Sequence, residues 1–187
     1  MASTARATPI AYSESVSGDL GTFLPSTQFT LDAGANTVSG TSHFFGPTSS
    51  TDFDSFAFVV PAGMQLVGLS YSFVMTPLPS TIESDAKTTY VLENGNGGPS
   101  IASSTIDLLG ASPVNEFGAQ LPLGPGIYSL QNTILETTSA SGWTSDYTWT
   151  LDVRGTAAVP EPMSLVLLGT GLVGVGARRW RTRRQRS

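Results

Sequence analysis

Short apolar runs that alternate with polar residues recur along the first 153 residues, separated by clusters of glycine, proline, asparagine and aspartate. A hydrophobic period of two is typical of a β-strand with one buried face. No stretch of this region shows leucine- or alanine-rich helical periodicity. The pattern predicts eight strands, at 28–31, 37–40, 54–60, 65–75, 88–93, 100–109, 126–131 and 146–153.

Several of these strands also predict which side chains share a face. Phe56, Phe58 and Val60 lie two residues apart, so all three point the same way. Strict alternation in 65–75 places Leu66 on the face opposite Leu69. The last strand has the clearest pattern, with one face formed by Tyr147, Trp149, Leu151 and Val153.

The connections between the runs are turn clusters, at 61–63, 77–79, 94–99 and 123–126. Many short strands joined in this way are typical of a sandwich. We therefore predict an all-β fold, a single antiparallel β-sandwich of jelly-roll-like type over 16–153. An N-terminal extension at 1–15 precedes it and a linker at 154–159 follows. About 150 residues suffice for one buried core.

The pattern changes at the C-terminus, residues 160–187. Pro160 and Pro162 favour an exposed, extended strip around Glu161. Residues 163–177 are uncharged and would reach about 22 Å as a helix, against a hydrocarbon core of roughly 30 Å. Trp180 and the long arginine side chains after the run extend this reach. We predict one short transmembrane helix at 163–177 with a basic end at 178–186, and the positive-inside rule places the body across the membrane.

A buried C-terminal helix is the alternative. Four glycines between 169 and 176 make a poor helix in water. Six arginines directly after an uncharged run are also hard to place in an acidic domain.

These C-terminal residues together resemble the PEP-CTERM sorting domain of exopolysaccharide-producing Gram-negative bacteria. The resemblance implies an exosortase partner, a transient inner-membrane intermediate with the body in the periplasm, and export to the cell surface or extracellular matrix. The sorting motif is Val159, Pro160, Glu161 and Pro162. The membrane segment and basic stop are Met163, Leu165, Leu168, Gly169, Gly171, Gly174, Arg178, Arg179, Arg181, Arg183, Arg184 and Arg186.

Proteins of this kind carry an N-terminal signal peptide, yet residues 1–10 contain no apolar stretch. Residues 5–7 resemble the small-residue region beside a cleavage site. We therefore expect a signal peptide upstream of the first residue. A stop codon directly upstream, with no alternative start, would contradict this expectation.

Charge and composition narrow the function. Residues 1–160 hold 13 acidic and three basic residues, a formal charge of −10, which argues against nucleic-acid binding. The chain has no cysteine and one histidine, His43, which excludes Cys–His catalysis and a multi-histidine metal site. No Gly-x-Ser-x-Gly motif is present. We therefore expect no enzymatic activity. A pair of carboxylates for glycoside hydrolysis is the exception that the sequence does not test, because such a site is defined by distance in space and has no sequence motif.

Two ligand sites are conceivable. Asp52 and Asp54, with nearby loop carbonyls, offer hard oxygen ligands for calcium, or else they simply begin a strand and stay solvated. No other cofactor is expected. The sequence places Trp143 in a loop, where its ring would be free to stack on a sugar; core packing is the alternative for the aromatic residues of this region.

Part of the body resembles the bacterial pre-peptidase C-terminal type of β-sandwich. The resemblance rests on residues 52–63, the glycine-rich stretch at 94–98 and residues 124–128. It implies a non-catalytic, jelly-roll-like module.

Three functions fit the sequence. The first is a non-enzymatic surface or matrix protein associated with biofilm or exopolysaccharide and cleaved at its C-terminal motif. The second is an extracellular carbohydrate- or calcium-binding module, and the third is a secreted hydrolase.

Overall fold

The computed structural model describes residues 8–44, 51–77, 86–137 and 142–156, without the side chains of 134–137. These residues belong to one compact unit, Met1–Thr156, and residues from Ala157 onward form a second unit. The sorting motif, the transmembrane helix and the arginine cluster predicted at 159–186 all lie outside the described residues.

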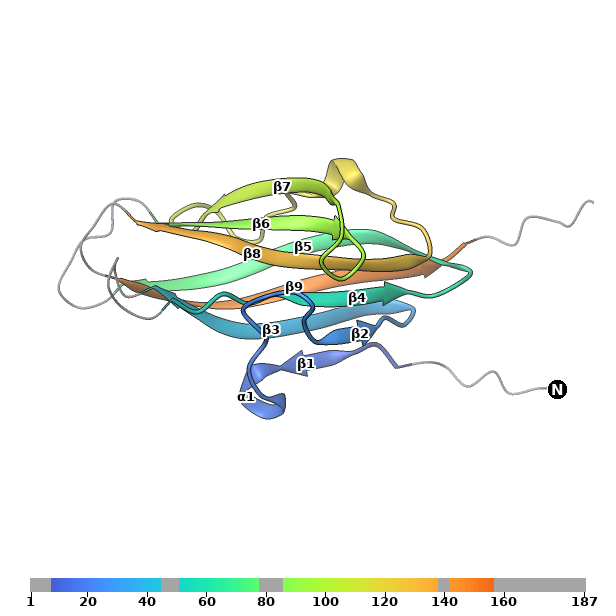
Figure 1. Cartoon of the computed structure of the whole chain (residues 1–187), viewed down its shortest axis with the longest axis horizontal. Coiled ribbons are helices and arrows are strands. Elements are labelled where there is room, and N and C mark those ends of the chain that lie inside the picture. The colour runs from blue at the N-terminus through green and yellow to red at the C-terminus, as the bar shows by residue number, and fades with distance from the viewer. Residues whose placement is uncertain (1–7, 45–50, 78–85, 138–141, 157–187) are drawn as a thin grey trace, which may run out of the picture. The chain divides into compact units, whose positions relative to one another are not determined.

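Nine strands form two sheets (Figure 1). The first sheet has the order β1-β3-β9-β5, with β1 at Ala11–Ser13, β3 at Gly34–Phe44, β9 at Trp143–Gly155 and β5 at Met64–Pro77. The second has the order β2-β4-β8-β6-β7, with β2 at Gln28–Thr30, β4 at Phe56–Val60, β8 at Gly126–Thr137, β6 at Ala86–Asn94 and β7 at Ser100–Asp107. Each of the eight predicted strands has a counterpart, and β1 is additional.

The expectation of purely antiparallel sheets is wrong at the N-terminus. Strand β1 pairs with β3 in parallel, and β2 pairs with β4 in parallel. Parallel neighbours require a long connection between them. Here the connection from β1 to β3 includes β2 in the other sheet, and the connection from β2 to β4 includes β3. The chain therefore alternates between the sheets before its first antiparallel hairpin.

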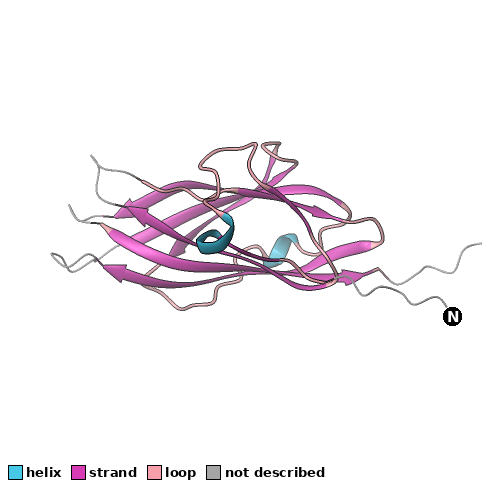
Figure 2. Ribbon diagram, turned by 90° about the horizontal axis from the view of Figure 1, so that it is seen from below, coloured by secondary structure: helices cyan, strands magenta, loops and turns pink. Residues whose placement is uncertain are grey.

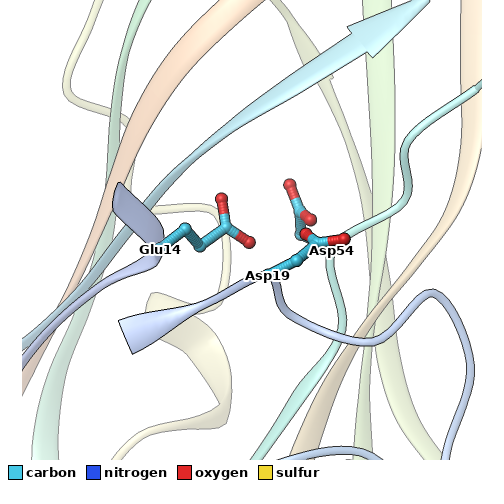
Figure 3. A group of neighbouring side chains, drawn as sticks. All are labelled: Glu14, Asp19 and Asp54. Carbon is cyan, nitrogen blue, oxygen red and sulfur yellow. The ribbon is translucent and has the colours of Figure 1, made fainter. Parts of the chain in front are cut away.

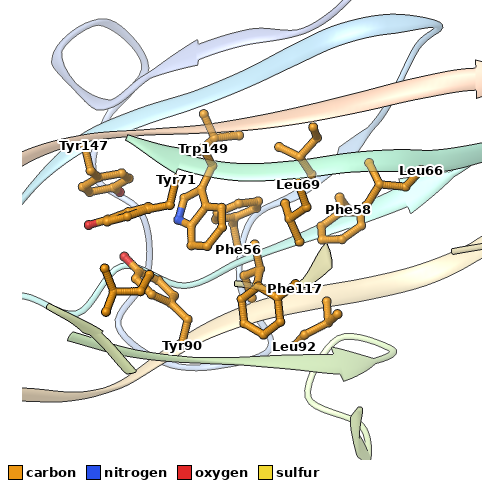
Figure 4. Packing of buried hydrophobic residues seen from close by; sticks show 14 of the residues in the cluster. Phe56, Phe58, Leu66, Leu69, Tyr71, Tyr90, Leu92, Phe117, Tyr147 and Trp149 are labelled. Carbon is orange, nitrogen blue, oxygen red and sulfur yellow. The ribbon is translucent and has the colours of Figure 1, made fainter. Parts of the chain in front are cut away.

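The core lies between the two sheets and is rich in aromatic rings (Figure 4). Tyr71 on β5 packs against Tyr90 on β6, with ring centroids 5.4 Å apart, and Trp149 on β9 meets Tyr90 edge-on at 5.0 Å. Phe117, from the loop after β7, is also buried against Trp149. The predicted inward faces of β4 and β9 are confirmed, because Phe56, Phe58, Val60, Tyr147, Trp149, Leu151 and Val153 are all buried.

The predicted faces of β5 need one correction. Leu66 and Leu69 are three residues apart, and strict alternation puts them on opposite faces, yet both are buried. A register shift between Leu66 and Gly68 against β9 explains this. One extra residue at such a β-bulge turns the following side chains to the other face.

The outer edge of β5 is covered by the long loop between β7 and β8. Leu123 exchanges backbone hydrogen bonds with Leu66, at 2.9 and 3.0 Å, and Val114 does the same with Tyr71, at 3.0 and 2.8 Å. An uncovered edge strand is a template for unwanted pairing with another chain. The loop therefore protects this edge.

Helical structure in the described ranges is limited to α1, Glu14–Ser17, and a 3-10 turn, η1, Gly118–Gln120 (Figure 2). Among the described residues, therefore, no helix is long and apolar enough to cross a membrane. Strand β1 and the start of α1 fall within residues 1–15, which the sequence suggested to be an extension.

Candidate functional site

Three carboxylates from separate parts of the chain converge near the edge of the first sheet (Figure 3). Glu14 begins α1, Asp19 lies in the loop after it, and Asp54 lies just before β4. One oxygen of each carboxylate lies within 4.8 Å of an oxygen of the other two. No other group of three or more acidic, histidine or cysteine side chains with this spacing occurs among the described residues.

The backbone fixes the carboxylate of Glu14. Its Oε1 accepts a hydrogen bond from the amide of Leu20 at 2.9 Å, and its Oε2 accepts one from the amide of Thr41 at 2.9 Å. Strand β1 pairs with β3 up to Ser13 and Ser39. Glu14 follows directly, so its side chain continues the contact with β3 where the backbone of β1 turns into α1.

A glycine makes room for this carboxylate. Gly40 lies on β3 opposite Tyr147 of β9. A Cβ atom at position 40 would overlap Oε2 of Glu14 and would lie 2.6 Å from the Tyr147 hydroxyl. The missing side chain therefore leaves a space at the margin of the core, and the carboxylate of Glu14 fills it.

Asp54 is the buried member of the cluster, with 1% of its surface exposed. Neither of its carboxylate oxygens accepts a hydrogen bond of normal geometry. The pKa of Asp54 is raised to about 9, first by burial and then by the charges of Glu14 and Asp52, whereas the nearby Tyr147 hydroxyl opposes the shift. A buried carboxylate without donors is costly, so Asp54 requires either a proton or a cation.

The other groups around Asp54 are also perturbed. Burial raises the pKa of Glu14, and the amides of Leu20 and Thr41 oppose this rise. The hydroxyls of Tyr71, Tyr90 and Tyr147 lie at one end of the core (Figure 4). Burial raises the pKa of all three, and the charge of Asp54 adds to this, so they stay neutral at physiological pH.

Asp19 connects the cluster to solvent. It is exposed, and with Glu14 it lines an open surface hollow of about 500 Å³. Asp146 of β9 lines the same hollow and accepts a hydrogen bond from the Thr41 hydroxyl at 2.8 Å. A small ion can therefore reach the cluster from outside, whereas a sugar ring cannot contact the buried Asp54.

The structure separates the two aspartates that the sequence suggested as a calcium pair. Asp54 belongs to the acidic cluster, but Asp52 lies beside His43, with Oδ2 3.5 Å from Nδ1. Burial and the charge of Asp19 raise the pKa of Asp52, and His43 lowers it. Residues two apart, such as Asp52 and Asp54, face the same side only while the chain is a regular strand, and residues 52–55 precede β4.

The expectation that Trp143 is an exposed loop residue is wrong. Trp143 is the first residue of β9, is fully buried, and packs against Phe44 with ring centroids 6.4 Å apart. Its ring faces the core because it continues the inward alternation of Tyr147 and Trp149. It cannot stack on a sugar without unfolding this end of β9.

Sequence reasoning missed Glu14 and Asp19. They are 40 and 35 residues from Asp54 along the chain, and only the parallel pairing of β1 brings them close. The available signal was the pair of acids on either side of Gly18, in an N-terminal segment whose other charged residue up to position 31 is Arg6, and this signal is weak.

The C-terminal segment is identified by comparison with known proteins. The compact unit ends at Thr156, and the Pro-Glu-Pro tripeptide at 160–162 follows almost at once. Residues 158–184 match the PEP-CTERM protein-sorting motif. This motif implies export, processing by an exosortase and sorting to the cell surface. A comparison with curated proteins found no match to the chain.

Proposed function

We propose that this chain is a non-enzymatic cell-surface or extracellular-matrix protein whose β-sandwich is the delivered cargo. The observation that carries this proposal is the match of residues 158–184 to the PEP-CTERM motif, two residues after the compact unit ends. In the sequence, the sorting signal follows the folded β unit directly.

In this function the C-terminal segment holds the chain at the inner membrane, with residues 163–177 as the membrane span and the six arginines on the cytoplasmic side. An exosortase then cleaves the chain near residues 160–162, and the sandwich reaches the cell surface or matrix. Association with exopolysaccharide or biofilm fits an acidic, polar module of this kind, and is part of the proposal.

The described residues support a non-enzymatic role. In the Glu14–Asp54 pair, the two carboxylates are close enough to share a proton, but Asp54 is buried and cannot contact a substrate. Glycoside hydrolysis requires two carboxylates that flank the scissile bond. A secreted hydrolase therefore has no support from this cluster.

Expression in an exosortase-bearing Gram-negative host, with membrane fractionation and intact mass, tests the proposal. We expect the wild-type chain to lose about 25 residues and leave the inner membrane. Replacement of Pro160, Glu161 and Pro162 by alanine should leave the chain intact and membrane-bound. The matched control is the wild-type chain in the same host without its exosortase, which should behave like the variant.

The opposite result is equally clear. If the wild-type chain keeps its C-terminus in both hosts, the segment is a permanent anchor or a core helix. The surface and matrix assignment then loses its basis.

A calcium-binding module is the second candidate function. The observation that favours it is the acidic cluster of Glu14, Asp19 and Asp54. Carbohydrate binding through Trp143 has no comparable support, because that ring is buried.

A further inference from the structure

The acidic cluster has the composition of a site for a hard cation. All its ligand atoms are carboxylate oxygens, which calcium prefers, and two oxygens bound to one calcium ion lie at most about 5 Å apart. The oxygens of Glu14, Asp19 and Asp54 lie within 4.8 Å of one another. One ion can therefore contact all three without a large movement of the chain.

Asp54 supplies a second and independent indication. Its carboxylate is 1% exposed, points toward the other two carboxylates (Figure 3), and accepts no hydrogen bond of normal geometry. The buried Tyr147 hydroxyl lies close enough to lower the pKa of Asp54, but it forms no hydrogen bond of normal geometry. Buried polar groups are normally satisfied, so a buried carboxylate without a well-formed hydrogen bond, aimed at two other carboxylates, indicates a missing ligand.

We propose that Glu14, Asp19 and Asp54 bind one calcium ion at the junction of the N-terminal segment and the two sheets. This inference deepens the second candidate function, on which it rests, and is independent of the sorting function. The ion would compensate three negative charges in a body that has only three lysine or arginine residues. Each oxygen of Glu14 accepts one amide hydrogen bond and retains a lone pair for a metal.

The chemistry favours calcium over other metals. Zinc and the later transition metals select histidine and cysteine, and the cluster contains neither. Magnesium usually keeps several waters and needs near-ideal octahedral geometry, whereas calcium accepts several carboxylates in a flexible arrangement. The exposed Asp19 and the open hollow provide the path for entry.

Bound calcium would join three parts of the fold. Glu14 is held on β3 through the Thr41 amide, and Asp54 precedes β4 in the other sheet. The neighbouring Ser55 amide donates a hydrogen bond to the carbonyl of Gly21 at 3.0 Å. The ion would therefore clamp the loop after α1 between the two sheets, and calcium should raise the unfolding temperature.

Thermal denaturation of the full chain in detergent, after chelation and dialysis, tests this proposal. With an affinity typical of extracellular calcium sites, about 0.1–1 mM, 10 mM calcium should raise the unfolding temperature by about 3–10 °C. Asp19→Asn changes an exposed residue that folding tolerates, and should weaken calcium binding at least about tenfold in titration calorimetry. Glu14→Gln, which retains a hydrogen-bond acceptor, should have the same effect.

Asp146→Asn is the matched control, because Asp146 lines the same hollow but is not one of the three ligands. Its response to calcium should equal that of the wild type. The proposal is overturned if calcium produces neither heat nor a thermal shift, since Asp54 and Glu14 would then share a proton instead. It is also overturned if magnesium acts as strongly as calcium, or if Asp19→Asn and Asp146→Asn respond alike.

Discussion

Gly40 and Glu14 share one place in the fold, because the carboxylate of Glu14 fills the space that a side chain at position 40 would occupy. The glycine is on β3 and the glutamate begins α1, so a residue without a side chain on one element admits a charged group from another. The backbone of Gly40 has an ordinary strand conformation. Glycine is required here because a side chain would collide with the Glu14 carboxylate, not because of backbone strain.

Gly40→Ala should therefore displace Glu14. Insertion of a methyl group into a filled space costs about 1–3 kcal/mol of unfolding free energy, and the calcium-dependent rise in unfolding temperature should shrink with it. Urea denaturation of the full chain, with and without calcium, measures both effects. Gly124→Ala is the control, because its Cβ would meet nothing within 4 Å, and it should change stability by less than about 0.5 kcal/mol. Equal effects of the two changes would contradict the geometry.

Asn36 is a second buried position on which several segments depend. Its Oδ1 accepts hydrogen bonds from the amides of Ile10 and Asp32, both at 3.0 Å, and its Nδ2 donates to the carbonyl of Leu151 at 3.2 Å. Asn36→Ala should lower the unfolding free energy by about 2–4 kcal/mol, because it leaves buried backbone groups without partners.

Chemical denaturation checks this prediction, and Asn115→Ala, at an exposed site, is the control. A loss below about 1 kcal/mol at position 36 would show that the segment around Ile10 does not depend on this side chain.

The calcium-free chain should lose stability as the pH rises. Aspartate in the unfolded chain titrates near 3.8, whereas Asp54 in the folded chain titrates near 9. Below about pH 4 the group is protonated in both states and its contribution is fully present. Between about pH 4 and 9 the unfolded state releases the proton more readily, so the unfolding free energy falls with pH. The titratable groups around Asp54 are Tyr12, Glu14, Asp19, Asp52, Tyr71, Tyr90 and Tyr147.

Urea denaturation across this range, in the presence of a chelator, measures the slope. Asp54→Asn keeps the shape of the side chain but cannot ionise, and should flatten the slope. An unchanged slope in the variant would mean that other groups cause the pH dependence.

Trp143→Ala should reduce stability and leave any binding of polysaccharide by the folded protein unchanged. The ring is fully buried beside Phe44, and its loss should cost about 3–5 kcal/mol. Phe23→Ala, at a side chain that is 74% exposed, should be nearly neutral in the same denaturation experiment. A variant at position 143 with wild-type stability and lost sugar binding would restore the stacking hypothesis.

The sequence revealed most of the fold because side-chain alternation reports directly on burial. The aromatic positions of β4 and β9 alternate without interruption, and all of them face the core. Alternation could not reveal the bulge after Leu66, since one extra residue in a strand leaves no compositional mark. Nor could it reveal β1, which is three residues long and gains its place from pairing with β3.

Of the three residues in the acidic cluster, only Asp54 could be identified from the sequence, for a related reason. Asp54 stood out through its spacing from Asp52, but the pair separates where the chain is not yet a strand. The partners of Asp54 are residues that tertiary pairing brings in from the N-terminus. Local spacing identifies sites made by one segment, whereas this site is made by two segments that are far apart in the sequence.

The position of β9 has a consequence for the order of events in export. Strand β9 pairs with both β3 and β5, and among the described residues β5 has no other strand partner in its sheet. When the chain is exported with its N-terminus first, this sheet cannot be completed until β9, the last strand, has also crossed the membrane. That strand ends at Gly155 and the PEP-CTERM motif begins at residue 158. Two residues separate the last strand from the sorting motif. A chain truncated before β9 therefore cannot complete the first sheet and also lacks the sorting motif.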